Sequence, residues 1–220
     1  NVGSVLLAKK IGEKHFKEFI EETNLTQNPK IELEEVGVPH RLKWNKCKLE
    51  TVSFGHGITT TPLQATALYA AMINGGKIVI PSLIKQRKTE NSKSIISTDT
   101  SDKLRNILRK VVSSKDGTAS LADKDGYYVG GKTGTAESYG DKKNRINTFI
   151  SVFPTNKPNY TLFVMLENPK INKDLIYNYR GVKTKAPYNT SGWNSVYVAG
   201  KIIEKIGPIL AINNKDFNDL

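Results

Sequence analysis

Three segments between residues 127 and 167 constrain the fold more than any other part of the chain. Residues 127–136, 147–154 and 159–167 alternate in polarity with a period of two, which predicts three β-strands. The tetrapeptide Thr155-Asn156-Lys157-Pro158 leaves room only for a tight turn between the last two strands. These two strands are therefore predicted to be antiparallel neighbours in a meander.

Helices are predicted on the N-terminal side of this meander. The apolar spacing in residues 2–22 indicates two helices that are broken near Gly12. Thr61 followed by Pro62 is typical of an N-cap and a first helical position, and Gly75-Gly76 would end that helix. Ser97 is expected to cap a further helix that has one apolar face.

A last helix is predicted over residues 193–206, stopped by Gly207-Pro208, where it can cover one face of the sheet. Residues 168–191 between the meander and this helix are expected to form a long polar loop. No shift in composition marks a domain boundary. The sequence thus predicts an α+β fold in which helices flank an antiparallel sheet.

The composition is that of an ordinary globular protein, with 38% hydrophobic and 25% charged residues. Its formal net charge of +12 permits binding to nucleic acid, anionic membranes or other anionic polymers. Because the lysines are scattered and no nucleic-acid-binding motif accompanies them, we expect a solvated surface and no nucleic-acid partner. Cys47, the only cysteine, is expected to be buried, and it supports neither an internal disulfide nor a zinc cluster.

The run from Gly130 to Ala136 carries the strongest chemical signal. Lys132 offers an ammonium group, Thr133 a hydroxyl donor, and Gly134 a position where a ligand backbone can approach the strand closely. Thr135 adds a second hydroxyl and an outward backbone N–H, which could form half of an oxyanion hole. This set suits a substrate carboxylate and an extended peptide that docks as an extra strand.

Several blocks surround this run. They are Ser53-Phe54-Gly55-His56-Gly57 with Thr61-Pro62-Leu63-Gln64, then Asn74-Gly75-Gly76-Lys77, Asp116-Gly117-Thr118-Ala119, Lys132-Thr133-Gly134, and Ser191-Gly192-Trp193-Asn194 with Gly200-Lys201-Ile202-Ile203. In order and at similar spacing, from the first residue to about residue 210, these blocks resemble class B penicillin-binding proteins. The septal, cell-division peptidoglycan D,D-transpeptidases are the most similar members.

This resemblance implies a penicillin-binding protein and serine β-lactamase-like fold that is incomplete at its N-terminal side. Residues 1–220 would be the C-terminal portion of a single transpeptidase domain. The family combines Ser-x-x-Lys, Ser-x-Asn and Lys-Thr-Gly. Asn1 resembles the Asn of the second motif, and the nucleophilic serine is expected upstream of this sequence. The stretch Ser82-Leu83-Ile84-Lys85 matches Ser-x-x-Lys literally, but it follows an extended segment and is expected to be a coincidence.

The resemblance also implies a mechanism and partners. The absent serine would attack the D-Ala-D-Ala end of a peptidoglycan stem peptide, with Asn1, Lys132, Thr133, Gly134 and Thr135 in the catalytic and binding site. β-Lactams would mimic that peptide end, and other cell-division proteins are expected partners. No cofactor is expected. The enzyme would work at the periplasmic side of the bacterial inner membrane, with its anchor upstream, and this chain alone is expected to be inactive.

Two alternatives stay open from the sequence. A serine β-lactamase or penicillin sensor would share the Lys-Thr-Gly strand, and it would differ from a transpeptidase in how fast it releases penicillin. A basic, non-enzymatic anion-binding module would instead show salt-dependent binding to a polyanion. Glu137, Tyr139 and Asp141 follow the Lys-Thr-Gly strand and are expected at the rim of its cleft.

Overall fold

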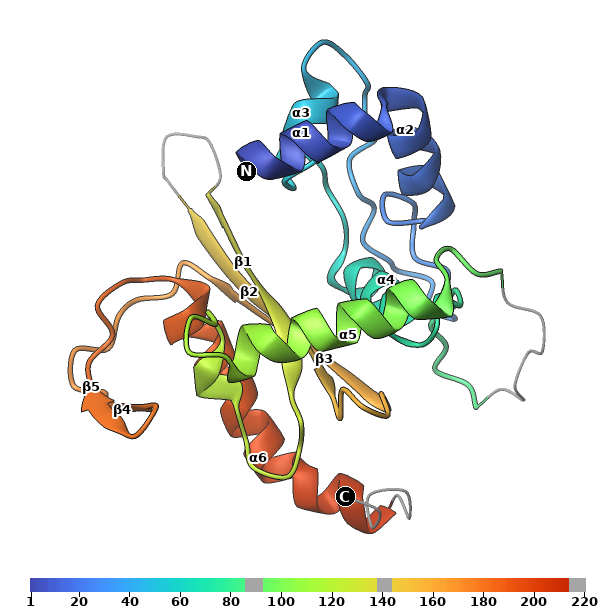
Figure 1. The fold of residues 1–220 in the computed structure, drawn as a ribbon. Helices are drawn as coiled ribbons and strands as arrows, with labels where there is room; N and C mark the ends of the chain where they lie inside the picture. The colour runs from blue at the N-terminus through green and yellow to red at the C-terminus, as the bar shows by residue number, and fades with distance from the viewer. Residues whose placement is uncertain (86–92, 138–143, 214–220) are drawn as a thin grey trace. The chain divides into compact units, whose positions relative to one another are not determined.

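The computed structural model describes residues 1–85, 93–137 and 144–213, and it is drawn in Figure 1. Two compact units divide the chain, Asn1–Ser101 and Asp102–Leu220, which we call the N-unit and the C-unit. Each unit has its own helices, and the sheet that carries the candidate site belongs to the C-unit.

The N-unit confirms the predicted helix breaks and caps. Helix α1 (Val2–Ile11) and helix α2 (Glu13–Glu22) are separated at Gly12, whose φ of 89° suits a glycine. After the short helix α3 (Lys48–Val52), helix α4 (Pro62–Ile73) begins at Thr61, whose hydroxyl accepts the backbone N–H of Gln64 at 3.1 Å.

Helix α5 (Thr98–Ser113) starts in the N-unit and continues into the C-unit. The hydroxyl of Ser97 accepts the backbone N–H of Thr100 at 3.2 Å, which confirms the predicted cap. The expectation that Cys47 is buried is wrong. Cys47 is exposed and has a left-handed φ of 65°, because it lies in the turn just before α3.

The C-unit contains the predicted antiparallel meander. Strands β1 (Gly130–Glu137), β2 (Arg145–Phe153) and β3 (Tyr160–Glu167) form a sheet in the order β1-β2-β3. The β1–β2 register places Thr133 opposite Phe149, and the β2–β3 register places Phe149 opposite Val164. β1 starts three residues later than predicted, after Tyr128, whose φ is 47°. Both strand pairings are antiparallel, and the β2–β3 pairing confirms the turn signal at residues 155–158.

Helix α6 (Ser195–Asn213) covers one face of this sheet, beside the short 3₁₀ helix η1 (Ser120–Ala122) (Figure 1). Its inward side chains pack against β2 and β3. Residues that are almost fully buried form the core between them: Phe149, Phe153, Val164, Val196, Ala199 and Ile203. Burial of this many large apolar side chains is the main source of stability in the C-unit.

Two expectations for the C-terminal region are wrong. Helix α6 continues through Pro208 to Asn213 instead of stopping at Gly207. Gly207 serves a close approach, because a Cβ there would lie 2.3 Å from the ring of Tyr127. The region 168–191 is not only loop, since β4 (Tyr177–Tyr179) and β5 (Val182–Thr184) form a hairpin. Arg180 and Gly181, both at positive φ, make its turn.

Arg109 fastens α5 to the start of β1. Its Nη1 donates to the carboxylate Oδ1 of Asp123 at 2.8 Å and to the carbonyl of Val129 at 2.7 Å. We expect Arg109→Ala to lower the free energy of unfolding by about 1–2 kcal/mol, because two charge-assisted bonds are lost from a partly exposed side chain. Urea unfolding followed by circular dichroism measures this. Arg105→Ala is the control, because Arg105 pairs with Asp102 of its own helix. Equal losses in both variants would contradict the fastening role.

Candidate functional site

The candidate site is built on β1, an edge strand of the sheet. β1 pairs with β2 along one side, and no strand pairs with its other side within the described residues. An unpaired strand edge offers backbone donors and acceptors to an extended peptide. The geometry therefore supplies the docking edge that the sequence predicted.

Strand alternation sends the side chains of β1 to two different faces. A Cβ on Gly131 would meet the ring of the buried Phe149, so residues 131, 133 and 135 face the same side as that ring. Lys132 and Gly134 face the other side, where a Cβ on Gly134 would meet the hydroxyl of Thr148. The side chain of Lys132 therefore lies on the opposite face of β1 from those of Thr133 and Thr135.

A cavity of about 410 Å³ opens beside Thr133 and Thr135. Its other walls come from the turn at residues 115–118, from Tyr179, and from residues 190–193. The hydroxyl oxygens of Thr133 and Thr118 lie 3.3 Å apart, and those of Thr135 and Ser191 lie 2.9 Å apart. The cavity therefore presents hydroxyl groups along one side of the open strand edge, which suits a small anionic group.

Lys132 lies outside this cavity lining, and its side chain is exposed. Its Nζ donates to the carbonyl of Thr133 at 2.6 Å, so the ammonium group lies against the backbone of its own strand. A positive charge stands on one side of the edge and hydroxyl donors on the other. A peptide docked along β1 would therefore meet both.

The hairpin β4–β5 contributes the far wall of the cavity. The ring of Tyr179 stacks on Trp193 with 5.0 Å between centroids, and Arg180 lies over the Tyr179 ring at 5.1 Å. Arg180 also donates to the carbonyls of Ser114 at 2.6 Å and Gly117 at 3.1 Å, which ties the hairpin to the 115–118 turn. Burial, with Tyr197 nearby, raises the pKa of the Tyr177 phenol behind this wall.

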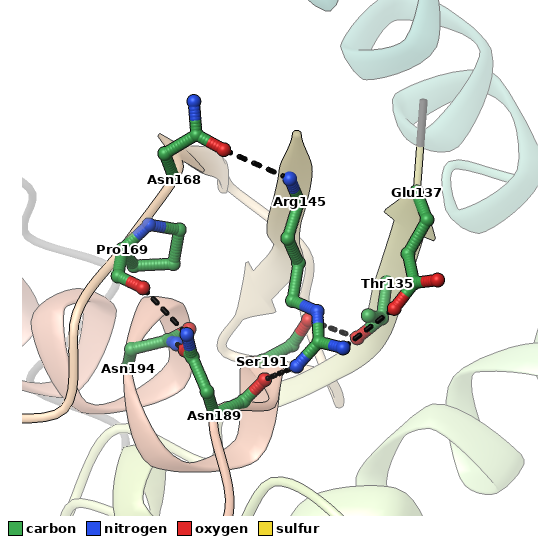
Figure 2. Close-up of polar contacts among 8 residues, drawn as sticks. All are labelled: Thr135, Glu137, Arg145, Asn168, Pro169, Asn189, Ser191 and Asn194. Carbon is green, nitrogen blue, oxygen red and sulfur yellow. Dashed lines mark hydrogen bonds and ion pairs between the residues drawn. The ribbon is translucent and has the colours of Figure 1, made fainter. Parts of the chain in front are cut away.

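A polar network at the end of the sheet holds the segment that contains Ser191 (Figure 2). Arg145 donates to the carboxylate of Glu137 at 2.5 Å and to the carbonyl of Asn189 at 2.9 Å. Asn189 donates to the carbonyl of Pro169 at 2.5 Å and accepts from Asn194 at 3.0 Å. The end of β1 is thereby joined to the loop that walls the cavity.

The structure brings together four of the five predicted catalytic residues, Lys132 to Thr135, on one strand. The fifth, Asn1, is the exposed N-cap of α1 in the N-unit, and its role stays a prediction. Glu137 ends β1, while Tyr139 and Asp141 lie outside the described residues. The hydroxyl of Ser82 contacts the Glu32 carboxylate at 2.5 Å and the Ile84 carbonyl at 2.9 Å in a bend, not at the start of a helix.

Sequence reasoning did not assign a role to several residues that surround the cavity. Ser191 and Trp193 belong to the block Ser191-Gly192-Trp193-Asn194, which supported the family resemblance but was assigned no role in the site. The alternation in Tyr177-Asn178-Tyr179, followed by Arg180-Gly181, was the overlooked signal for the hairpin wall. No sequence pattern around Arg145 indicated a role at the site, because only the folded chain places Arg145 beside Asn189.

The described residues include neither a metal-binding cluster nor a membrane-spanning helix. No group of three His, Cys, Asp or Glu side chains there is arranged to hold a metal ion. No helix in those residues has the length and apolar character needed to cross a membrane.

Comparison with known sequences gives a consistent result. Residues 1–189 match the family described as the penicillin binding protein transpeptidase domain. The chain is 30% identical over 230 residues to the probable peptidoglycan D,D-transpeptidase FtsI of Caulobacter vibrioides, covering 98% of this chain and 37% of that protein. It is 33% identical over 189 residues to the stage V sporulation protein D of Bacillus subtilis, covering 77% of this chain and 29% of that protein.

Solved structures show the same fold. The transpeptidase domain of penicillin-binding protein 3 from Burkholderia pseudomallei superposes with a TM-score of 0.77 at 21% identity, over 94% of this chain and 61% of that one. Penicillin-binding protein 3 from Mycobacterium tuberculosis, solved in complex with aztreonam, gives a TM-score of 0.74 at 24% identity, over 94% of this chain and 49% of that one. The sheet and its flanking helices are thus those of a penicillin-binding protein.

Proposed function

Because this chain belongs to the penicillin-binding protein transpeptidase domain family, we propose that it forms the substrate-binding wall of a peptidoglycan D,D-transpeptidase. Residues 1–220 would be the C-terminal portion of one transpeptidase domain in a longer protein. One observation carries the proposal: the Lys-Thr-Gly run lies on an open strand edge with two hydroxyls turned into a cavity. That geometry fits an extended peptide that ends in a carboxylate.

The donor peptide would dock antiparallel or parallel to β1 through backbone hydrogen bonds, with its D-Ala-D-Ala end near Thr133. The hydroxyls of Thr133, Thr135 and Thr118 would donate to the terminal carboxylate inside the cavity. The backbone N–H of Thr135 would supply half of an oxyanion hole for the tetrahedral intermediate. D-Ala then leaves, and an amine on a neighbouring peptidoglycan strand attacks the ester that the serine nucleophile has formed with the donor peptide.

Lys132 would act on the other side of the strand from the carboxylate. Its side chain is separated from the Thr133 and Thr135 hydroxyls by strand alternation, so it is not their direct companion in the cavity. We assign it to the proton network around the nucleophile, together with the Ser-x-x-Lys serine and lysine. A fixed ammonium favours the ionised nucleophile and the negative charge that develops in the transition state.

The wider assignment follows the relatives. The Caulobacter vibrioides relative carries the name "Probable peptidoglycan D,D-transpeptidase FtsI", which favours this activity over a β-lactamase or a sensor. β-Lactams would bind as mimics of D-Ala-D-Ala, and the Mycobacterium tuberculosis neighbour was solved in complex with the β-lactam aztreonam. We also propose that the longer protein acts at the division septum, on the periplasmic side of the inner membrane, to which a membrane anchor would hold it. Other cell-division proteins would be its partners.

The proposal predicts how penicillin labels this chain and the longer protein. We expect residues 1–220 alone to form no covalent adduct with a fluorescent penicillin, because Ser82 is held by Glu32 and does not begin a helix. The longer protein should show one labelled band on a denaturing gel. A labelled band from residues 1–220 that disappears in Ser82→Ala would contradict this reading. Ser53→Ala is the control substitution, because Ser53 is also a half-buried serine outside the helices and strands.

A further inference from the structure

Ser191 is a buried hydroxyl behind the substrate-binding edge that the proposed mechanism does not use. It begins the 3₁₀ helix η2 (Ser191–Trp193), and only 1% of it is exposed. Its Oγ contacts the carbonyl oxygen of Gly134 and lies 2.9 Å from the Oγ1 of Thr135. We propose that Ser191 is a positioning residue that fixes the Thr135 side chain for binding the substrate carboxylate. This inference rests on the proposed function.

The hydrogen-bond directions follow from the number of protons available. A carbonyl oxygen only accepts, so the single hydroxyl proton of Ser191 goes to the carbonyl of Gly134. The bond between Ser191 and Thr135 must then use the Thr135 proton, with Ser191 as the acceptor. Ser191 thereby holds two consecutive residues of β1, one through its backbone and one through its side chain.

This arrangement prepares Thr135 for an anion. Threonine populates more than one χ1 rotamer, and the bond to Ser191 selects the one that faces the cavity. A carboxylate that enters the cavity can take the Thr135 proton by rotation of the hydroxyl alone, with no change of rotamer. The ligand then does not have to order the Thr135 side chain, and the entropy cost of that ordering does not lower its affinity.

The segment that carries Ser191 is itself held in place. The Ser191 carbonyl accepts from the hydroxyl of Ser195 at 3.2 Å, and Asn189 is held by Arg145 and Pro169 (Figure 2). Arg145 also pairs with Glu137, which lies two residues beyond Thr135 and on the same face of β1. Arg145 therefore joins the loop to the strand at one end, and Ser191 joins them beside the cavity.

The test measures acylation of the longer protein by penicillin, with separate values for initial binding and for the rate at saturation. We expect Ser191→Ala to lower the second-order rate constant about three- to tenfold, chiefly through weaker binding, because the hydrogen bond that positions the Thr135 hydroxyl is lost. The matched control is Ser151→Ala. Ser151 is fully buried in β2, and its hydroxyl donates to the carbonyl of Leu162 at 3.2 Å. The control should stay within about twofold of the wild type.

A double-mutant cycle separates positioning from general packing. If Ser191 acts through Thr135, the Ser191→Ala change should have less than about a twofold effect in a Thr135→Val background. Arg145→Gln is a second variant that leaves the buried residues intact. It should lower the rate constant in the same direction and with the same dependence on Thr135.

Three outcomes would overturn the inference. Additive losses from Ser191→Ala and Thr135→Val, or a Ser151→Ala loss as large as that of Ser191→Ala, would reduce Ser191 to a packing residue. If Ser191→Ala does not fold, additive losses from Arg145→Gln and Thr135→Val would overturn it instead. In these cases the wild type is still acylated, so the proposed function stands. A wild-type protein that penicillin does not acylate would end both proposals.

Discussion

Replacing Lys132 by alanine is expected to slow acylation of the longer protein by penicillin about 10²- to 10³-fold. The exposed ammonium of Lys132 lies on the opposite face of β1 from the cavity hydroxyls, where we place the nucleophile and its proton network. Its loss removes a fixed positive charge from the region in which negative charge develops. Stopped-flow or gel-based labelling with a fluorescent penicillin measures the rate constant.

The matched control for this variant is Lys183→Ala, because Lys183 is an exposed lysine on β5 outside the cavity lining. It should leave the rate constant unchanged. Lys132→Arg keeps the charge but not the shape of the ammonium, so it should recover part of the lost rate. A Lys132→Ala protein that is acylated at the wild-type rate would show that the charge on this strand takes no part in the reaction.

Alanine at Gly131 is expected to act mainly on stability, and alanine at Gly134 mainly on acylation by penicillin. A Cβ on Gly131 would lie 2.5 Å from the Phe149 ring and 2.6 Å from the Ile150 carbonyl, in the packed core and the β2 backbone. Gly131→Ala should therefore lower the free energy of unfolding by about 2–3 kcal/mol. Urea unfolding of residues 1–220 measures this loss.

Gly134→Ala makes a milder contact in the same strand. Its Cβ would meet only the Thr148 hydroxyl, at 2.5 Å, and that side chain can rotate away. We expect a stability loss below about 1 kcal/mol, with acylation of the longer protein reduced about tenfold because the ligand backbone no longer approaches closely. A reversed order, with Gly134→Ala less stable than Gly131→Ala, would mean that the strand faces are assigned the wrong way round.

Local signals in the sequence were sufficient to predict most of the framework. Period-two alternation and the turn at residues 155–158 predicted the meander, because strand pairing over a short connection depends on residues close in sequence. Thr61 and Ser97 predicted their helix starts, because a cap is a contact between residues three apart. The Lys-Thr-Gly residues were placed on the correct strand for the same reason.

The remaining features depend on contacts between residues far apart in the chain. Helix α6 continues past Gly207 because that glycine lets Tyr127 pack against the helix, a contact across 80 positions. Ser191 reaches Gly134 and Thr135 only after the sheet, the hairpin and the Arg145 network are in place. Strand alternation alone predicts that Lys132 and the cavity hydroxyls lie on opposite faces of β1. Only the structure shows that the cavity lies on the Thr133 and Thr135 face, and this is what gives the separation a functional meaning.

The central claim is that β1 binds the donor peptide of a D,D-transpeptidase. Release of D-alanine from a stem pentapeptide ending in D-Ala-D-Ala, measured with an amine acceptor present, tests it most directly. We expect the longer protein to release one D-alanine for each cross-linked product, and Thr133→Val to weaken this reaction strongly without unfolding the protein. A wild-type protein that hydrolyses penicillin rapidly and releases no D-alanine would show that β1 does not bind a transpeptidase donor peptide.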